Sequence, residues 1–230
     1  MALKPEKRDT VRCPFFTWKR QNFMSRTISG KVIFVIIIGF LATAAFARNS
    51  VWKNEYTLWK DVVQKSPNKA MPHVNFGNAF VRRGKLDYAE KEFKLALNVN
   101  PRDTRAINGL AVIYLKQKNY DEAIRLFEIL AKDKPNEAPF QSNLGAAYME
   151  KGLLDEAIES FRRAINVAPA FPDAHNNLGL AYKKKGKLAM AKEEFEKALQ
   201  SSPEHIDAKR NLNEVMQLME KKRPNEVTEK

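Results

Sequence analysis

The chain has 230 residues and a formal net charge of +13, from 40 lysines and arginines against 27 acidic residues. This length allows one ordinary globular domain or a short repeat array, and it excludes a large multidomain enzyme. Cys13 is the only cysteine, which excludes an internal disulfide and a cysteine metal site.

The positive charge is concentrated near the N-terminus. Residues 1–31 carry eight lysines and arginines against two acids, whereas residues 70–205 carry twenty-one against eighteen. A nucleic-acid-binding protein would instead concentrate basic charge on its folded surface. We therefore expect no nucleic-acid partner, and a basic block beside an apolar run favours a membrane.

Residues 1–27 form this basic N-terminal segment, and an apolar run follows. The stretch "VIFVIIIGFLATAAFA", residues 32–47, contains no charged residue. A helix rises about 1.5 Å per residue, so residues 28–47 would reach the ~30 Å of a bilayer core. They predict a single transmembrane helix or signal anchor. The flanking charges favour a cytoplasmic N-terminus, with the rest of the chain periplasmic or lumenal.

Two other interpretations of the apolar run stay open. The small residues of "AFA" at 45–47 resemble a signal-peptidase site, so cleavage would release a secreted protein. A buried helix of a soluble domain is the other possibility.

Residues 48–69 predict a helix that belongs to the fold. Trp52, Tyr56, Trp59 and Val63 recur at helical spacing on one face. Trp59 also stands 34 residues before the first member of a later aromatic series. This segment is therefore predicted to be half of a repeat, packed against the first full repeat, and not a linker.

From residue 70 onward the sequence repeats every 34 residues. The spacing separates prolines, aromatic residues and small residues in register: Pro67, Pro101, Pro135, Pro169 and Pro203; Trp59, Phe93, Phe127, Phe161 and Phe195; Gly77, Ala111, Gly145 and Gly179. The predicted units are 70–103, 104–137, 138–171 and 172–205. A capping helix at 206–221 and a disordered tail at 222–230 are predicted to follow.

The stretches "SNLGAAYMEKGLLDEAIESFRRAINVAP" and "NNLGLAYKKKGKLAMAKEEFEKALQSSP" resemble the tetratricopeptide repeat. The resemblance implies an all-α fold, a right-handed α-solenoid of helix hairpins, here preceded by the one transmembrane helix. Gly84, Gly152 and Gly186 are predicted to end first helices in the left-handed conformation. Lys118 occupies that position in the second unit, which predicts a sterically less favourable turn there.

In this family the first helices line a concave groove that holds a partner's peptide or helix. Recurring asparagines here resemble the asparagine ladder of O-linked N-acetylglucosamine transferases, which grips a peptide backbone through amide hydrogen bonds. Gly109 interrupts the ladder. In the alternative interpretation the asparagines bond only to nearby turns and backbone. The candidate peptide-binding residues are Asn75, Asn78, Arg82, Asn108, Lys116, Asn143, Met149, Asn176, Asn177 and Lys183.

Motifs for catalysis are missing from the sequence. It contains no phosphate-binding glycine loop, nucleophile elbow or paired metal motif, so we expect no enzyme activity, metal or cofactor. His73 and His175 occupy the same repeat position three units apart, which predicts a structural role.

The stretch "RNSVWKNEYTLWKDVVQKSPNKA" follows the apolar run and precedes the repeats. With this stretch, residues 27–205 look like the C-terminal part of membrane proteins related to O-mannosyltransferases that contain transmembrane helices and tetratricopeptide repeats. The catalytic loop of those relatives has no counterpart here, so catalysis is not expected. The predicted function is a membrane-tethered, non-catalytic scaffold that binds a protein or peptide partner. The alternative is an accessory or detached C-terminal portion of a membrane glycosyltransferase. The oligomeric state is not predicted.

Overall fold

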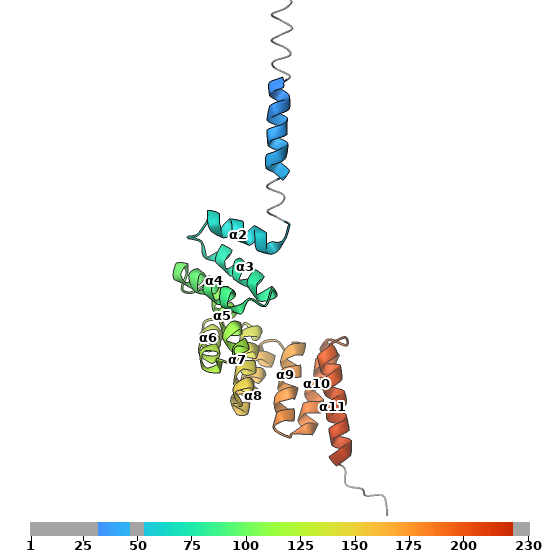
Figure 1. The fold of residues 1–230 in the computed structure, drawn as a ribbon. Coiled ribbons are helices and arrows are strands. Elements are labelled where there is room, and N and C mark those ends of the chain that lie inside the picture. Colours follow the sequence, from blue (N-terminus) through green and yellow to red (C-terminus); the bar gives the residue numbers. More distant parts are fainter. Residues whose placement is uncertain (1–31, 47–52, 223–230) are drawn as a thin grey trace, which may run out of the picture. The chain divides into compact units, whose positions relative to one another are not determined.

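The computed structural model describes residues 32–46 and 53–222, and the regular elements in those ranges are all helices (Figure 1). The chain divides between Leu58 and Trp59 into two units, and the repeats lie in the second. The labelled helices are α2 (Glu55–Lys65), α3 (Ala70–Arg82), α4 (Leu86–Val99), α5 (Thr104–Lys116), α6 (Tyr120–Asp133), α7 (Ala138–Lys151), α8 (Leu154–Val167), α9 (Pro172–Lys184), α10 (Leu188–Ser201) and α11 (Ile206–Lys222).

The apolar run does not form the predicted transmembrane helix. Its described helix covers residues 32–46. Across 32–46 and 53–222, no helix has both the length and the apolar character needed to span a membrane. The prediction of a single-pass protein anchored through 28–47, with extracytoplasmic repeats, is therefore wrong. Residues 28–31 and 47, which the predicted span needed, lie outside the described residues.

The helices of the second unit pack in consecutive pairs. Each first helix packs against the second helix of its own repeat, as α3 does with α4 and α9 does with α10. Each second helix also packs against the next first helix, from α4 on α5 to α10 on α11. Every repeat is therefore covered by its neighbour, as expected for a tetratricopeptide-like solenoid.

One turn recurs inside every repeat. The first helix is closed by a backbone hydrogen bond across six residues, from Leu153 N to Tyr148 O at 2.9 Å in the third repeat. The residue before the donor is left-handed in each case, with φ of 68° at Gly84, 89° at Gly152 and 75° at Gly186. Lys118 fills this place in the second repeat with φ of 61°, and within the described ranges it is the only non-glycine residue with positive φ. The predicted left-handed conformation is confirmed at the three glycines, and the steric cost at Lys118 stays a prediction.

A second turn recurs between repeats. Asp103 N donates to Asn100 O at 3.1 Å. The backbone N–H groups of Glu137, Phe171 and His205 donate the equivalent bonds in the later turns. The turn after α2 closes in the same way, from Lys69 N to Ser66 O at 3.3 Å. The C-terminus of α2 therefore has the local structure of a second helix. No residue of α2 is fully buried.

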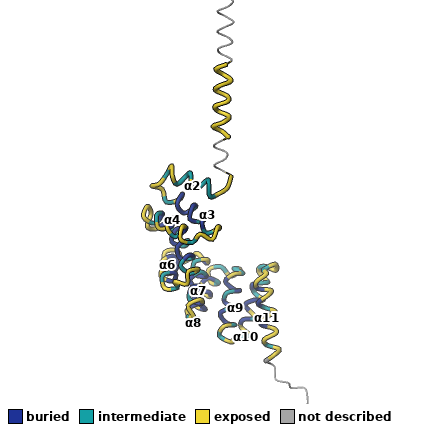
Figure 2. Tube along the Cα trace, in the orientation of Figure 1, coloured by how far each residue is buried: buried dark blue, intermediate teal, exposed yellow. Residues whose placement is uncertain are grey.

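A phenylalanine ring fills the centre of each repeat. Phe93, Phe127, Phe161 and Phe195 are all 0% exposed, and the buried residues run along the inside of the helix pairs (Figure 2). A Cβ atom built on Gly145 would lie 2.7 Å from Phe161 Cε1 and 3.1 Å from the Ala157 carbonyl oxygen. Glycine is needed where α7 crosses α8 chiefly because a side chain at residue 145 would overlap the Phe161 ring.

Phe161→Ala should lower the free energy of unfolding by about 3 to 5 kcal/mol, because it empties a fully enclosed site. Chemical denaturation of the full chain monitored by circular dichroism measures this loss. Ile129→Ala is the control, since Ile129 is 38% exposed and its removal should cost less than about 1 kcal/mol. Equal effects of the two substitutions would contradict the assigned core.

Lys118→Gly should raise the free energy of unfolding by about 1 kcal/mol, because glycine adopts the left-handed conformation without a steric penalty. The reverse change in an equivalent turn, Gly152→Lys, should lower it by a similar amount. The same denaturation experiment measures both, and a loss of stability in Lys118→Gly would be the contrary result.

Candidate functional site

The first helices form a continuous row along the second unit. α3 contacts α5, and α7 contacts both α9 and, through Asn143, α5. α9 in turn contacts α11. We call the partly exposed residues of α3, α5, α7 and α9 the first-helix face.

Amide side chains join neighbouring helices across this face. Asn143 Nδ2 donates to Asn108 Oδ1 at 3.2 Å, and Asn211 Nδ2 donates to Asn176 Oδ1 at 2.9 Å. Within α9, Asn176 Nδ2 approaches Asn177 Oδ1 at 3.5 Å. The two bonds between helices join residues 35 apart, so the asparagines do not pair with their own repeat equivalents. They contribute to stacking and still retain donors and acceptors, because an amide has two donors and one acceptor oxygen.

The other predicted residues lie in different environments. Asn75 Nδ2 donates to Met71 Sδ at 3.0 Å, and Asn78 is partly buried. Arg82 and Lys116 lie in the last turns of α3 and α5, where both remain accessible to solvent. The predicted set therefore does not form a single cluster.

Two predicted residues are engaged elsewhere. Met149 is 8% exposed and belongs to the core shared by the third and fourth repeats. Lys183 forms an ion pair with Glu214 of α11, and this hydrogen bond holds the pKa of Glu214 below its usual range. Gly109 has no side chain that could contribute to the row of asparagines. A Cβ atom there would lie 2.5 Å from Phe93 Cζ.

The two equivalent histidines are buried and hydrogen-bonded. His175 Nδ1 lies 2.7 Å from Glu194 Oε2, and its Nε2 lies 3.0 Å from the Pro169 carbonyl oxygen. His73 makes the same two contacts, with Glu92 and with the carbonyl oxygen of Pro67. Each histidine thus ties a first helix to its second helix and to the preceding turn. In the described part of the chain, no group of three or more histidine, cysteine, aspartate or glutamate side chains could hold a metal.

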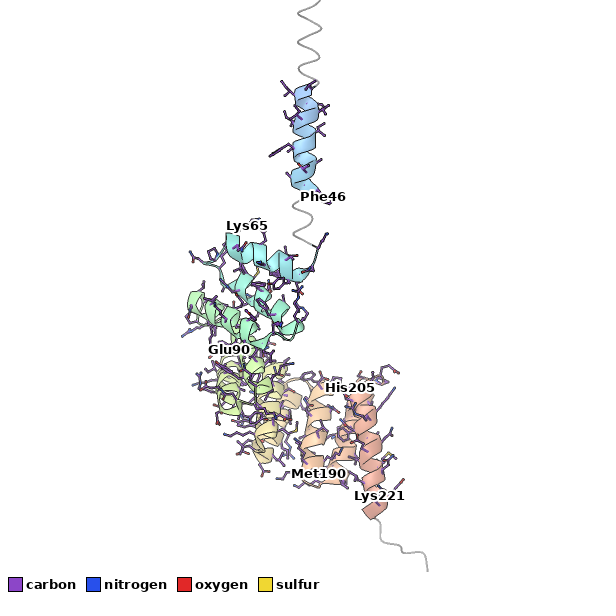
Figure 3. All side chains as sticks on the ribbon, viewed as in Figure 1. Phe46, Lys65, Glu90, Met190, His205 and Lys221 are labelled. Atoms are coloured by element: carbon purple, nitrogen blue, oxygen red, sulfur yellow. The ribbon has the colours of Figure 1, made fainter. Side chains whose placement is uncertain are left out.

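His205 links the last repeat to α11. His205 is labelled in Figure 3. Its Nδ1 accepts the Ala208 backbone N–H at 3.2 Å, and its Nε2 lies 3.0 Å from Asp173 Oδ1. It therefore caps α11 and contacts the start of α9.

A pocket of about 610 Å³ opens between α6, α7 and α8. We call it the third-repeat pocket. Its lining combines apolar surface with charged and polar groups, among them Glu128, Lys132, Gln141, Tyr148, Glu156 and Arg163. None of the peptide-binding residues predicted from the sequence lines it.

The pocket lies where the histidine pattern is interrupted. The positions of His73 and His175 are held by Gln141 in the third repeat, and the position of Glu194 is held by Ser160. Ser160 Oγ donates to the carbonyl oxygen of Glu156 at 2.9 Å and does not reach Gln141. This break in two repeat columns was the signal in the sequence that could have revealed the pocket.

The pocket holds a tyrosine in an acidic environment. Tyr148 Oη donates to Glu128 Oε1 at 2.6 Å. Burial, that hydrogen bond and the charges of Glu128 and Glu156 together raise the pKa of Tyr148 to about 12, although Arg163 acts in the opposite direction. A phenolate would be a further negative charge among carboxylates, so its formation is disfavoured.

Glu128→Gln should lower the pKa of Tyr148 toward 10, because it removes a neighbouring negative charge. A pH titration followed by NMR of ring-labelled tyrosine measures the value. Glu196→Gln is the matched control, since Glu196 holds the same repeat position in α10. An unchanged Tyr148 pKa in Glu128→Gln would contradict the geometry.

Comparison with known families supports the assignment of the repeats. Residues 74–139 and 172–205 match models described as tetratricopeptide repeat, and residues 145–186 match a TPR repeat model. No curated protein matches the chain. None of these comparisons shows the resemblance to O-mannosyltransferase-like proteins.

Solved structures share the fold. The crystal structure of MamA is 25% identical over 63% of this chain and 85% of its own, with a TM-score of 0.57. The structure of MamA from Desulfovibrio magneticus RS-1 is 22% identical over 74% of this chain and 96% of its own, with a TM-score of 0.60. A thermophilic TPR protein of Thermus thermophilus is 24% identical over 65% of this chain and 82% of its own, with a TM-score of 0.59.

These matches agree with the helix pairs, the two recurring turns and the buried phenylalanines described above. Repeats of this kind generally mediate protein–protein interactions. Over residues 74–139 and 145–205, the chain is built of tetratricopeptide repeats.

Proposed function

We propose that the chain is a non-catalytic scaffold that binds an extended segment of a protein partner on its first-helix face. The arrangement of amides between neighbouring helices is the observation that carries this proposal. Asn143 and Asn177 are both partly exposed; Asn143 is held by its bond to Asn108, and Asn177 Oδ1 lies 3.5 Å from Asn176 Nδ2.

Their remaining hydrogen-bonding groups suit a peptide backbone. Asn143 uses one amide hydrogen for Asn108, which leaves a second hydrogen and its carbonyl oxygen. A backbone offers one N–H and one C=O per residue, so it can satisfy both. Recognition of this kind depends little on the partner's side chains. The solvent-accessible cations Arg82 and Lys116 would favour acidic residues near the bound segment.

The proposed scaffold consists of four repeats with a covering helix at the C-terminal end. At the C-terminal end, α11 packs on α10 and buries Ala208 and Val215 completely. At the other end, residues 48–69 would supply a half repeat. The turn at Ser66–Lys69 supports this assignment, because it closes like the turns between repeats.

Binding to the first-helix face can be tested with peptides selected from a random display library against the full chain. In fluorescence anisotropy, Asn143→Ala with Asn177→Ala should weaken a selected peptide at least tenfold. Two lost hydrogen bonds are each worth about 1 kcal/mol, and about 1.4 kcal/mol is a factor of ten. Asn98→Ala with Asn166→Ala is the matched control, because these exposed asparagines share one position on second helices. It should leave the affinity unchanged.

Chemical changes in the peptide provide a second test of binding to the first-helix face. Methylation of single backbone nitrogens should weaken binding more than replacement of the neighbouring side chains by alanine. The proposal is wrong if folded Asn143→Ala with Asn177→Ala binds the peptides like the unmodified protein, or if no selected peptide contacts the first-helix face.

A further inference from the structure

The third-repeat pocket arises from a local loss of volume. In the fourth repeat, His175 and Glu194 fill the space between the first and second helices and bond to each other at 2.7 Å. In the second repeat, the buried apolar pair Ile107 and Leu126 occupies the same two positions. Gln141 with the short Ser160 leaves this space incompletely filled, and the pocket opens there.

The charge around the pocket is negative. Four carboxylates line it against the two cations Lys132 and Arg163. Two of the carboxylates are already paired, since Glu159 bonds to Arg163 at 3.1 Å and Asp155 pairs with Lys185.

Glu128 and Glu156 are the two carboxylates that remain. Glu128 accepts a hydrogen bond from the neutral Tyr148 hydroxyl, and the Glu156 side chain forms no ion pair with any residue in the described ranges. Lys132 also lines the pocket, so these two carboxylates leave it with a net charge of −1, which favours a cationic ligand.

A buried acceptor lies in the same pocket. Gln141 is 7% exposed, and its Oε1 has no hydrogen-bond partner among the described residues. Buried amide oxygens are almost always hydrogen-bonded in folded proteins. A ligand that brings an N–H donor would complete this environment.

We propose that the third-repeat pocket binds an arginine side chain presented by a partner protein. A guanidinium group has five N–H donors in a planar arrangement and one positive charge, so it can donate to Gln141 Oε1 and to the carboxylates of Glu128 and Glu156 together. The volume of about 610 Å³ is in the usual range for a ligand site. This site is separate from the first-helix face and does not depend on the function proposed for that face.

NMR titration of the ¹⁵N-labelled full chain tests the proposal. The probe is acetyl-Gly-Arg-Gly-amide, and the control peptide carries citrulline, which has the shape of arginine without its charge. The arginine peptide should shift the Gln141 side-chain amide signals and the backbone signals of α7 and α8 in a saturable manner. The citrulline peptide should bind at least fivefold more weakly. Absence of saturable shifts, or equal binding of the two peptides, would overturn the proposal.

Substitutions locate the binding. Glu156→Gln should weaken the arginine peptide at least fivefold. Glu122→Gln should have no effect, because Glu122 holds the same place in the first turn of α6 and does not line the pocket. Asn143→Ala with Asn177→Ala should also have no effect, which separates this site from the first-helix face. Unchanged affinity in Glu156→Gln would count against the site.

A final variant exchanges the pocket pair for that of the fourth repeat. Gln141→His with Ser160→Glu should restore the histidine and glutamate contact, fill the pocket and abolish binding of the peptide while the thermal melt is retained. Retained binding in this folded variant would refute the site. If the variant does not fold, the test is the comparison of peptide affinity between Glu156→Gln and Glu122→Gln.

Discussion

A phenylalanine ring that is completely enclosed between helices is the contact on which the rest of this structure depends. Phe93 shows why, because Cβ atoms built on Gly77 of its own repeat and on Gly109 of the next would both overlap its ring. One side chain therefore holds a helix pair together and also joins it to the following pair. A single repeat cannot enclose such a ring alone, so stability comes from stacking.

This packing leaves the polar residues free to differ between repeats. The position of His73 and His175 holds isoleucine in the second repeat and glutamine in the third, while the helix pair is retained each time. The partner position changes with it, from glutamate to leucine to serine. The repeats thus tolerate changes at this pair because the phenylalanine at the next position along the second helix remains buried. One consequence is the pocket in the third repeat, where this pair is glutamine and serine.

The first-helix face and the third-repeat pocket differ in chemistry. The first-helix face presents amides such as Asn108 and Asn143, which bond to each other between neighbouring helices, with lysine and arginine at the helix ends. The third-repeat pocket instead presents carboxylates and a buried amide oxygen without a donor. Because the two surfaces use different side chains, substitutions in one should leave the other unchanged.

The sequence by itself determined the period of 34 and the left-handed turns, including the one at Lys118, because these depend on neighbours within a repeat. It also placed a phenylalanine in every repeat, although the next repeat contributes to the enclosure of a ring such as Phe93. Only the tertiary structure decided the partners of the asparagines, the burial of Met149 and the existence of the pocket. Bonds such as Asn108 to Asn143 join residues 35 apart, and a repeat alignment matches residues 34 apart. The membrane prediction rested on composition alone, and no helix in the described residues has both the length and the apolar character to span a membrane. Local periodicity thus specifies each helix pair, whereas contacts between pairs follow from the offset at which they stack.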